Sequence, residues 1–269
     1  MRSPMIQAWC SLVAALLAAS CGTMRSGGRW GEGATLRPGG ARLLSAARGA
    51  ALDPWTWGPL AGAGVIAIGG WDEDISDWAR EETPVFGSQQ DASDMSDDLH
   101  DLERQGWLVT VLATPSGSEA WPWAVDKAKG FAVEWSATFA TSALTSEIKS
   151  LTDRTRPDGS NERSFPSSHA SDAFAYFALA RRNLDAIDVS PLVRGSAKVG
   201  LGVVASGTAW ARVEAGVHYP TDVLVGAALG NFVACFVHDA FLGLPEDVQV
   251  TASVEPDVGE WAIGLAFSF

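Results

Sequence analysis

The motif Lys149-Ser-Leu-Thr-Asp-Arg-Thr-Arg156-Pro157 opens the stretch of sequence that decides the fold of this chain. A second motif, Phe165-Pro166-Ser167-Ser168-His169, follows shortly, and the third is Arg212-Val-Glu-Ala-Gly-Val-His218-Tyr-Pro-Thr-Asp222. From these motifs we single out three cations (Lys149, Arg156 and Arg212), two histidines, the carboxylate of Asp222 and the serines ahead of an expected helix. These are the groups needed to hold a phosphoryl group, attack it and protonate what leaves.

Helices are predicted around each motif. Before the first motif, large apolar residues recur every three to five positions, close to the helical period, at Trp135, Phe139, Leu144, Ile148 and Leu151. Lys149 therefore lies near the end of a long helix, which Pro157 cannot continue. Further helices are expected over residues 166–181, 197–212 and 220–240. The sequence thus predicts a mainly α fold, a helical bundle over residues 51–245.

The three cations, Lys149, Arg156 and Arg212, suit a phosphate group. A phosphate monoester carries close to two negative charges. Arginine binds it through paired hydrogen bonds, and lysine acts as a point charge. A helix that begins at Pro166-Ser167-Ser168 adds backbone N–H groups and the positive end of the helix dipole. An anion among these groups would offset the cost of bringing like charges together.

The histidines and the carboxylate suit covalent catalysis. Asp222 follows His218 by four residues, within reach of its imidazole. A carboxylate bound to Nδ1–H fixes the tautomer and leaves Nε2 to attack phosphorus. His169 is then the group suited to protonate the departing alkoxide.

Each of these residues also has a plainer interpretation. Lys149 and Arg156 fit solvated cations at a helix end, and Ser167 fits a simple helix N-cap. His218 with Asp222 fits a structural pair, and His169 a surface residue. The ordered occurrence of all three motifs favours a single site instead.

The motifs Lys-x6-Arg-Pro, Pro-Ser-x-His and Arg-x5-His-x3-Asp resemble the signature of the type 2 phosphatidic acid phosphatase superfamily. This superfamily includes bacterial acid phosphatases, lipid phosphate phosphatases and vanadium haloperoxidases. The resemblance is close from Lys149 to Asp222 and looser in the surrounding helices. Two positions depart from the usual pattern, because Ser168 stands where many members have Gly and Ala211 where Ser often precedes the Arg. Neither departure removes a catalytic group.

The resemblance implies a role for each matched residue. Lys149, Arg156 and Arg212 bind phosphate, and Ser167 and Ser168 assist through side chain and backbone. His218 forms a phosphohistidine intermediate, oriented by Asp222, and His169 is the general acid. No metal and no cofactor are implied.

Three functions are weighed. The first is a phosphatase that hydrolyses a lipid phosphate, an isoprenoid phosphate or a small phosphomonoester. The second is a haloperoxidase that holds vanadate in the same anion site. The third is a catalytically silent envelope lipoprotein that binds a partner. The intact motifs favour the first.

Residues 1–21 are typical of an export signal, with an apolar centre too short to span a bilayer. Small residues precede Cys21, as in a bacterial lipoprotein signal, so Cys21 is predicted to carry a lipid. An ordinary cleaved signal is the alternative. We therefore expect a cell-envelope protein, exported to the periplasm and anchored to the outer membrane as a lipoprotein.

The next segment, residues 22–50, is rich in Gly, Ala, Ser and Arg, which is typical of a flexible linker. Its positive charge suits anionic lipid headgroups, although a plain solvated linker fits equally. A short helix is expected near Leu43–Leu52.

Two apolar stretches bear on membrane contact, residues 54–71 and residues 223–237. The first is at the lower length limit for a membrane span and contains Pro and Gly. The second fits either the central helix of a bundle or a short membrane insertion. Because charges and breaks interrupt the helices, we favour a folded bundle outside the membrane.

The acidic residues are concentrated in residues 72–105, which are predicted to be a solvated scaffold of short amphipathic helices. The formal net charge of the chain is -13, which argues against nucleic acid as a partner. Residues 246–269 differ from the rest, because apolar and polar residues alternate on both sides of Pro256-Asp-Val-Gly259. This alternation predicts a C-terminal β-hairpin appended to the bundle.

Overall fold

The computed structural model describes residues 20–243, which form eight α-helices and one π-helical turn. In chain order the elements are α2 (Gly40–Leu52), α3 (Pro54–Gly69), α4 (Asp72–Glu82), α5 (Gln89–Ala113), α6 (Ala120–Thr152), α7 (Ser168–Ala186), α8 (Pro191–Glu214), α9 (Pro220–Val237) and η1 (His238–Leu242). The predicted mainly α bundle is confirmed over these residues.

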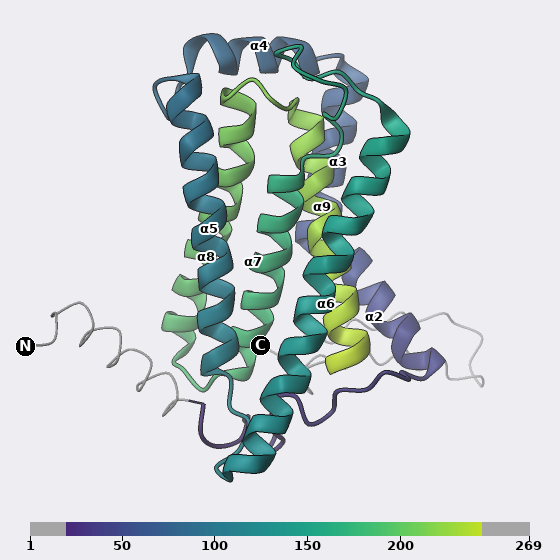
Figure 1. Ribbon diagram of the computed structural model, residues 1–269, viewed down its shortest axis with the longest axis vertical. Coiled ribbons are helices and arrows are strands. Elements are labelled where there is room, and N and C mark those ends of the chain that lie inside the picture. The colour runs from purple at the N-terminus through teal and green to yellow at the C-terminus, as the bar shows by residue number, and fades with distance from the viewer. Residues whose placement is uncertain (1–19, 244–269) are drawn as a thin grey trace, which may run out of the picture.

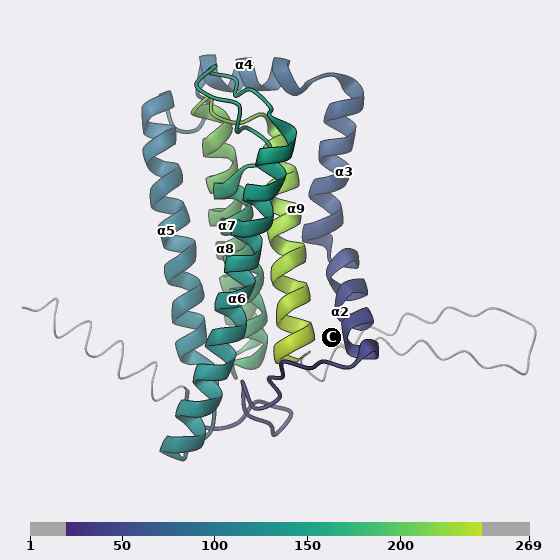
Figure 2. The same cartoon turned by 45° about the vertical axis from the view of Figure 1, so that its right-hand side comes forward.

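The long helices lie side by side, and α4 runs across one end of the bundle (Figures 1 and 2). We call this end the α4 end. The C-terminal ends of α6 and α8 and the N-terminal ends of α7 and α9 all lie there. All three sequence motifs are therefore brought to the same end of the bundle.

Helices α7 and α9 form the centre of the fold because small residues let them approach closely. A Cβ atom on Gly226 would lie 2.7 Å from the carbonyl oxygen of Ser167, and one on Gly230 would overlap the carbonyl oxygen of Ser171. The N–H of Ser167 also donates to the carbonyl oxygen of Asp222, at 3.0 Å. This contact fixes the start of α7 against the start of α9.

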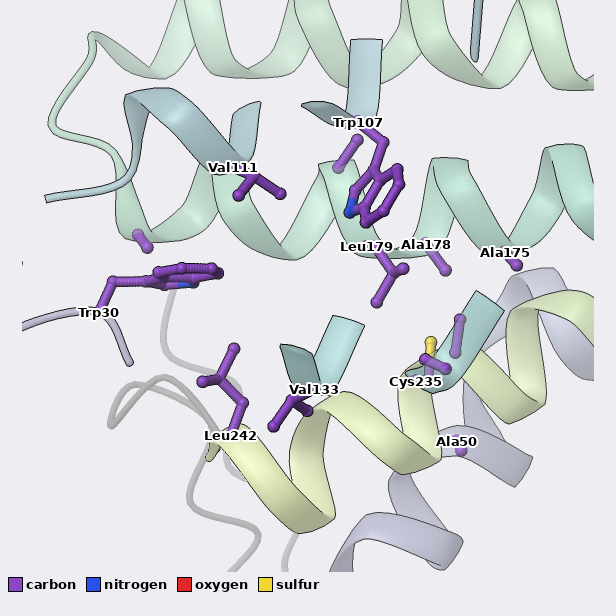
Figure 3. Close-up of a cluster of buried hydrophobic side chains, with 14 residues drawn as sticks. Trp30, Ala50, Trp107, Val111, Val133, Ala175, Ala178, Leu179, Cys235 and Leu242 are labelled. Atoms are coloured by element: carbon purple, nitrogen blue, oxygen red, sulfur yellow. The ribbon is translucent and has the colours of Figure 1, made fainter. Parts of the chain in front are cut away.

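Of the two apolar core clusters in the described part of the chain, one lies between the helices, away from the α4 end, and the second includes Ala79 of α4. Trp107 of α5 and Leu179 of α7 are almost fully buried in the first cluster, and Cys235 of α9 packs with them (Figure 3). Trp107 also donates its ring N–H to the buried carboxylate of Glu134 on α6, at 2.6 Å. The indole therefore fills the core and satisfies a buried acid.

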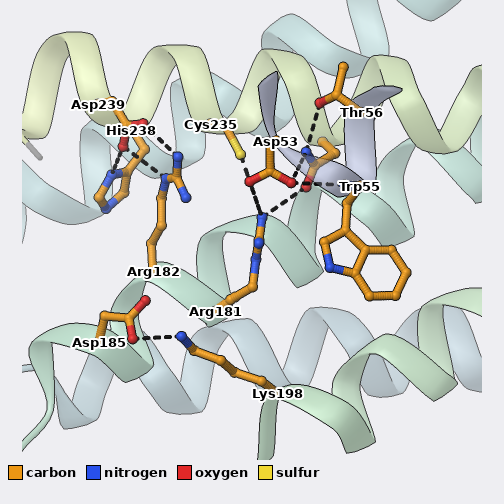
Figure 4. Close-up of polar contacts among 11 residues, drawn as sticks. Asp53, Trp55, Thr56, Arg181, Arg182, Asp185, Lys198, Cys235, His238 and Asp239 are labelled. Carbon is orange, nitrogen blue, oxygen red and sulfur yellow. Dashed lines mark hydrogen bonds and ion pairs between the residues drawn. The ribbon is translucent and has the colours of Figure 1, made fainter. Parts of the chain in front are cut away.

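A second set of polar contacts joins α3, α7 and α9 (Figure 4). Arg181 binds Asp53, the N-cap of α3, at 2.8 Å, and Asn231 of α9 donates to the same carboxylate. Beside them, Arg182 forms a two-bond pair with Asp239 of η1. These buried groups have partners, as groups removed from water require.

The helices expected around the motifs are present, with shifted bounds. The helix that ends near Lys149 continues to Thr152, where Asp153 adopts a left-handed conformation with φ of 43°. The expected helices over 166–181, 197–212 and 220–240 correspond to α7, α8 and α9. The acidic stretch was expected to form short helices, but it includes most of the 25-residue helix α5.

The segment predicted to be a flexible linker packs against the bundle instead. Trp30 is 3% exposed, and its backbone N–H donates to the carbonyl oxygen of Pro115. The carbonyl oxygens of Ser20 and Gly22, on either side of Cys21, accept from the loop before α6, at 3.0 and 2.7 Å. Cys21 is exposed, and these bonds place it near the start of α6, at the end of the bundle opposite the α4 end. Composition missed this packing because it depends on contacts with residues distant in sequence, among them the burial of Trp30 and the ion pair of Arg29 with Asp126 at 2.8 Å.

The two apolar stretches have different environments. Residues 223–237 lie in α9, which is surrounded by other helices, as expected of a central bundle helix. Within the described residues, one helix, Pro220–Leu242, is long and apolar enough to cross a membrane, and 67% of its apolar window is buried. Of residues 54–71, Pro54–Gly69 form α3, which exposes large apolar side chains at Trp57, Leu60, Val65 and Ile68.

Two predictions lie outside the described residues. They are the export signal up to residue 19 and the β-hairpin of residues 246–269.

Candidate active site

Every residue singled out from the motifs lies at the α4 end, where the ends of four helices and the loop between α6 and α7 supply them. Lys149 is in the last turn of α6, and Arg212 is in the last turn of α8. Ser167 precedes α7, whose first two residues are Ser168 and His169. The loop between α6 and α7 adds Arg156, His218 lies just before α9, and Asp222 lies in the first turn of α9.

The three cations lie close enough to act on one another. Burial, followed by the charge of Arg156, lowers the pKa of Lys149 to about 8. Burial and the same neighbour also lower the pKa of Arg212. Like charges are costly to gather in a partly desolvated place, and a bound anion would reverse both effects.

Several polar atoms in this group have no hydrogen-bond partner among the described residues. They are Arg156 Nε, Arg212 Nε, Ser167 Oγ and His218 Nδ1. Lys149 donates to the carbonyl oxygen of Arg163 at 2.8 Å, and Arg212 Nη1 donates to Ser96 Oγ at 3.0 Å. His218 Nδ1 faces Asp222. Buried donors are normally satisfied, so the open donors of Arg156, Arg212 and Ser167 mark a place suited to acceptor oxygens.

Ser167 is the N-cap of α7 by its backbone position, but its side chain does not cap the helix. The hydroxyl is fully buried and makes no protein hydrogen bond within the described chain. The plain N-cap interpretation therefore leaves the hydroxyl unexplained. An anion at the start of α7 would accept from this hydroxyl and from the first N–H groups of the helix.

His218 and Asp222 face each other at the start of α9. The Nδ1 atom of His218 lies 3.6 Å from Asp222 Oδ2, which is longer than a hydrogen bond and inside ion-pair range. Burial lowers the pKa of His218 to about 4, although Asp222 opposes this change. At neutral pH the imidazole is therefore uncharged, as a nitrogen nucleophile must be.

The carboxylate of Asp222 is completely buried and well supplied with donors. The Ser164 hydroxyl and the N–H of Tyr219 donate to Oδ2, and Arg154 donates to Oδ1 at 2.6 Å. Burial by itself raises the pKa of Asp222, but the contacts with His218, Ser164 and Arg154 outweigh it and lower the pKa. Asp222 is therefore ionised at neutral pH.

His169 contacts an acidic residue of α5. Its Nε2 atom lies 2.8 Å from Asp97 Oδ1, and its ring packs 5.3 Å from the ring of His100. Burial and the charge of Arg212 lower the pKa of His169 to about 4, against the raising effect of Asp97. A phosphate dianion beside these cations would raise that pKa and favour the protonated form that a general acid needs.

Motif reasoning missed four residues that contact the site: Ser96, Asp97, Arg154 and Ser164. Ser96 and Asp97 belong to the acidic stretch, which was predicted to be only a solvated scaffold. The structure corrects that interpretation, because one side of α5 faces the cations. No spacing signal marks these residues, whereas Arg154 and Ser164 could have been suspected from their place beside the motifs.

The described residues contain no group of three or more His, Cys, Asp or Glu side chains placed to hold a metal ion. The arrangement can bind an anion through Lys149, Arg156, Arg212 and Ser167. It can also present one neutral imidazole to that anion and a second imidazole to a leaving group.

Comparison with known proteins agrees with this geometry. A family model described as the PAP2 superfamily matches residues 132–244, which include all three motifs. Decaprenylphosphoryl-5-phosphoribose phosphatase from two strains of Mycobacterium tuberculosis is 31% identical over 145 residues, 49% of this chain and 70% of the relative. This chain belongs to the PAP2 superfamily.

This membership confirms the predicted resemblance and the prediction of a phosphoric ester hydrolase. Among solved structures, a transmembrane PAP2 type phosphatidylglycerolphosphate phosphatase from Bacillus subtilis is similar, with a TM-score of 0.49 and 22% identity. That alignment covers 68% of this chain and 92% of the Bacillus chain.

Proposed function

We propose that this PAP2 phosphatase hydrolyses the phosphate ester of a lipid or isoprenoid phosphate, or of a small phosphomonoester, through a phosphohistidine on His218. The observation that carries the proposal is the cluster of open donors from Arg156, Arg212 and Ser167. It lies beside an imidazole whose pKa is low enough to keep it neutral.

In the first step, Nε2 of His218 attacks phosphorus and the bond from phosphorus to the ester oxygen breaks. Lys149, Arg156 and Arg212 balance the charge on the phosphoryl oxygens. His169 gives its proton to the departing alkoxide, which leaves as an alcohol. Asp222 stabilises the positive charge that forms on His218.

In the second step, water attacks the phosphohistidine and the bond from phosphorus to nitrogen breaks. His169, now neutral, takes a proton from the water. Inorganic phosphate leaves, and His218 returns to its neutral form. Every proton transfer uses side chains of this chain, so we propose that hydrolysis needs no metal.

Two features support a lipid or isoprenoid substrate. The Mycobacterium relative is named for a substrate with a decaprenyl chain. In addition, α3, α6 and α8 carry exposed large apolar side chains, among them Leu60, Ile68, Phe131, Trp135, Phe139, Val199 and Val203. Such faces on a folded protein are typical of contact with lipid. We therefore propose that these flanks lie against a membrane.

Export to the periplasm and attachment to the outer membrane through Cys21 are further parts of the proposal. Their support is the signal-like sequence of residues 1–21 and the exposed position of Cys21. Incorporation of labelled palmitate, lost in Cys21→Ser, would test the anchor.

The experiment uses the full chain, purified in detergent, with an aryl phosphate, a decaprenyl phosphate and a phosphatidic acid as substrates. We expect hydrolysis that persists in excess chelator and is blocked by vanadate. Brief reaction with a ³²P-labelled substrate should leave label that is stable to base and labile to acid, as expected of phosphohistidine.

The matched variants are His218→Ala and Val217→Ala, which shortens the neighbouring side chain. Loss of label and activity only in the first supports the mechanism. Full activity in His218→Ala would exclude the covalent step. Halide oxidation that depends on added vanadate, without phosphatase activity, would favour the haloperoxidase.

A further inference from the structure

Arg154 lies two residues before the motif arginine Arg156, but it binds carboxylates instead of facing the open donors. Its Nη1 donates to Asp222 Oδ1 and its Nη2 to Asp72 Oδ2, each at 2.6 Å. Its guanidinium also stacks on the ring of Tyr219, 4.0 Å from the centroid. Arg154 therefore contacts two carboxylates, the hydroxyl of Thr221 and one ring.

Asp72, at the start of α4, holds Arg154 from the other side. The same carboxylate accepts from the N–H of Thr221 at 2.9 Å and from its hydroxyl. Thr221 adjoins Asp222 in the first turn of α9. Asp72 thus fixes both the arginine and the helix start on which the carboxylate stands.

The two carboxylate oxygens of Asp222 therefore have different partners. Oδ1 is occupied by Arg154, and Oδ2 faces Nδ1 of His218. The carboxylate is fully buried, so a charge there would be costly without a cation. Arg154 supplies that cation and limits the rotation of the carboxylate.

We propose that Arg154, held by Asp72, is a positioning residue that aims Asp222 at His218 and sets the charge of that pair. The inference rests on the proposed function of His218. It adds Arg154 and Asp72, the latter from α4, to the groups that determine the reactivity of His218.

The groups that face the pair come from several elements. Lys149 of α6 and Arg212 of α8 act on His218, and Arg154 acts on Asp222. Asp72 of α4 partly cancels Arg154, and α7 contributes the uncharged N–H of Ser167. Within the described chain, Arg154 and Asp72 can therefore be changed without removing a cation that faces the phosphate site.

Opposite signs follow for the two residues. Loss of a cation makes the coupled pair of Asp222 and His218 hold its proton more tightly, and loss of an anion does the reverse. In Arg154→Gln the acidic limb of the pH profile of kcat/KM should move to higher pH by roughly one unit. In Asp72→Asn it should move down. The double variant should return toward the wild-type position.

The control pair is Arg104 and Asp101, an exposed ion pair on α5. Arg104→Gln and Asp101→Asn should leave the acidic limb unmoved. Arg154→Lys keeps the positive charge but cannot bind Asp72 and Asp222 through two guanidinium nitrogens. The acidic limb of the pH profile should therefore stay in place, while kcat falls by up to about 100-fold. NMR titration of labelled histidine gives the pKa of His218 directly and does not need turnover.

The proposed function and this inference fail in different ways. An inactive wild-type protein would count against the phosphatase. An active wild type whose Arg154→Gln and Asp72→Asn variants fold, yet keep the acidic limb and the His218 titration unmoved, would overturn the positioning role. Limb shifts of the same sign in both variants would also overturn it.

Discussion

The Nδ1 atom of His218 lies 3.6 Å from the Oδ2 atom of Asp222, too far for a hydrogen bond, although three other donors hold that carboxylate in place. Catalytic hydrogen bonds are often long before substrate binds. In the proposed mechanism His218 gains positive charge during attack, and its attraction to Asp222 increases. We infer that this contact shortens as the phosphohistidine forms.

Replacement of the carboxylate tests this contact. Asp222→Asn keeps the shape but removes the charge, and the amide can donate to Nδ1 and stabilise the wrong tautomer. We expect kcat to fall by about 10³ to 10⁴, the size seen when an orienting carboxylate is lost. Asp101→Asn, on the exposed face of α5, should change kcat little. Retention of wild-type kcat in a folded Asp222→Asn protein would contradict the orienting role.

The contact between Asp97 and His169 predicts a dependence on the leaving group. Asp97→Asn removes a group that raises the pKa of His169, so this pKa falls further. Less of the general acid is then protonated at a given pH, and the basic limb moves to lower pH. We expect alkyl phosphates to lose about 10²-fold or more, and aryl phosphates, whose leaving groups need little protonation, to lose less.

The comparison uses Asp98→Asn, which removes the next exposed carboxylate on α5. This variant should keep the ratio of alkyl to aryl rates. Equal losses for both substrates in Asp97→Asn would argue against a proton donor at His169.

Close packing of α7 on α9 predicts a stability effect at Gly230. A methyl group there would overlap the carbonyl oxygen of Ser171, so Gly230→Ala must separate the helices. We expect a loss of about 1–3 kcal/mol in the free energy of unfolding, measured by denaturant titration. At Gly200 on α8 an added Cβ has no neighbour within 4 Å, so Gly200→Ala should be neutral or stabilising.

A buried acid on α5 predicts how stability depends on pH. Burial raises the pKa of Glu103 to about 8 from an ordinary value of 4.5. Between these values the folded protein holds a proton that the unfolded chain releases, so stability falls as pH rises. Glu103→Gln should therefore melt higher than wild type at pH 8, with a difference that disappears below about pH 4.5. The exposed Glu147→Gln serves as the control, and a pH-independent difference would contradict the assignment.

The helices, and the meeting of the three motifs at one end of the bundle, could be predicted because helix ends are marked by local sequence signals. The period of apolar residues around Phe139 and the break at Pro157 define helix ends, and chemistry-bearing residues at those ends meet when helices pack side by side. The contacts of Asp97 and Arg154 could not be predicted. They depend on which side of α5 faces inward and on where α4 crosses, and both are set by long-range packing.

Trp30 shows the same limit at the other end of the bundle. Its neighbours are typical of a linker, and only the assembled bundle supplies the surface that buries it. Composition indicates how a segment behaves in isolation, whereas burial of a single aromatic side chain can fix the segment against the rest of the protein.

Cys21 and the proposed catalytic residues lie at opposite ends of the bundle. Lys149 follows Ala120 by 29 residues on α6, which at about 1.5 Å per residue separates them by about 43 Å. That length exceeds the roughly 30 Å of a bilayer's hydrocarbon core. An acyl chain on Cys21 would therefore hold the protein with its reactive end pointing away from the anchoring leaflet. In that orientation the enzyme would act on substrates in a facing membrane or free in solution. To act on lipids of the membrane that anchors it, the bundle would have to lie with the apolar flanks of α3 and α6 against that membrane.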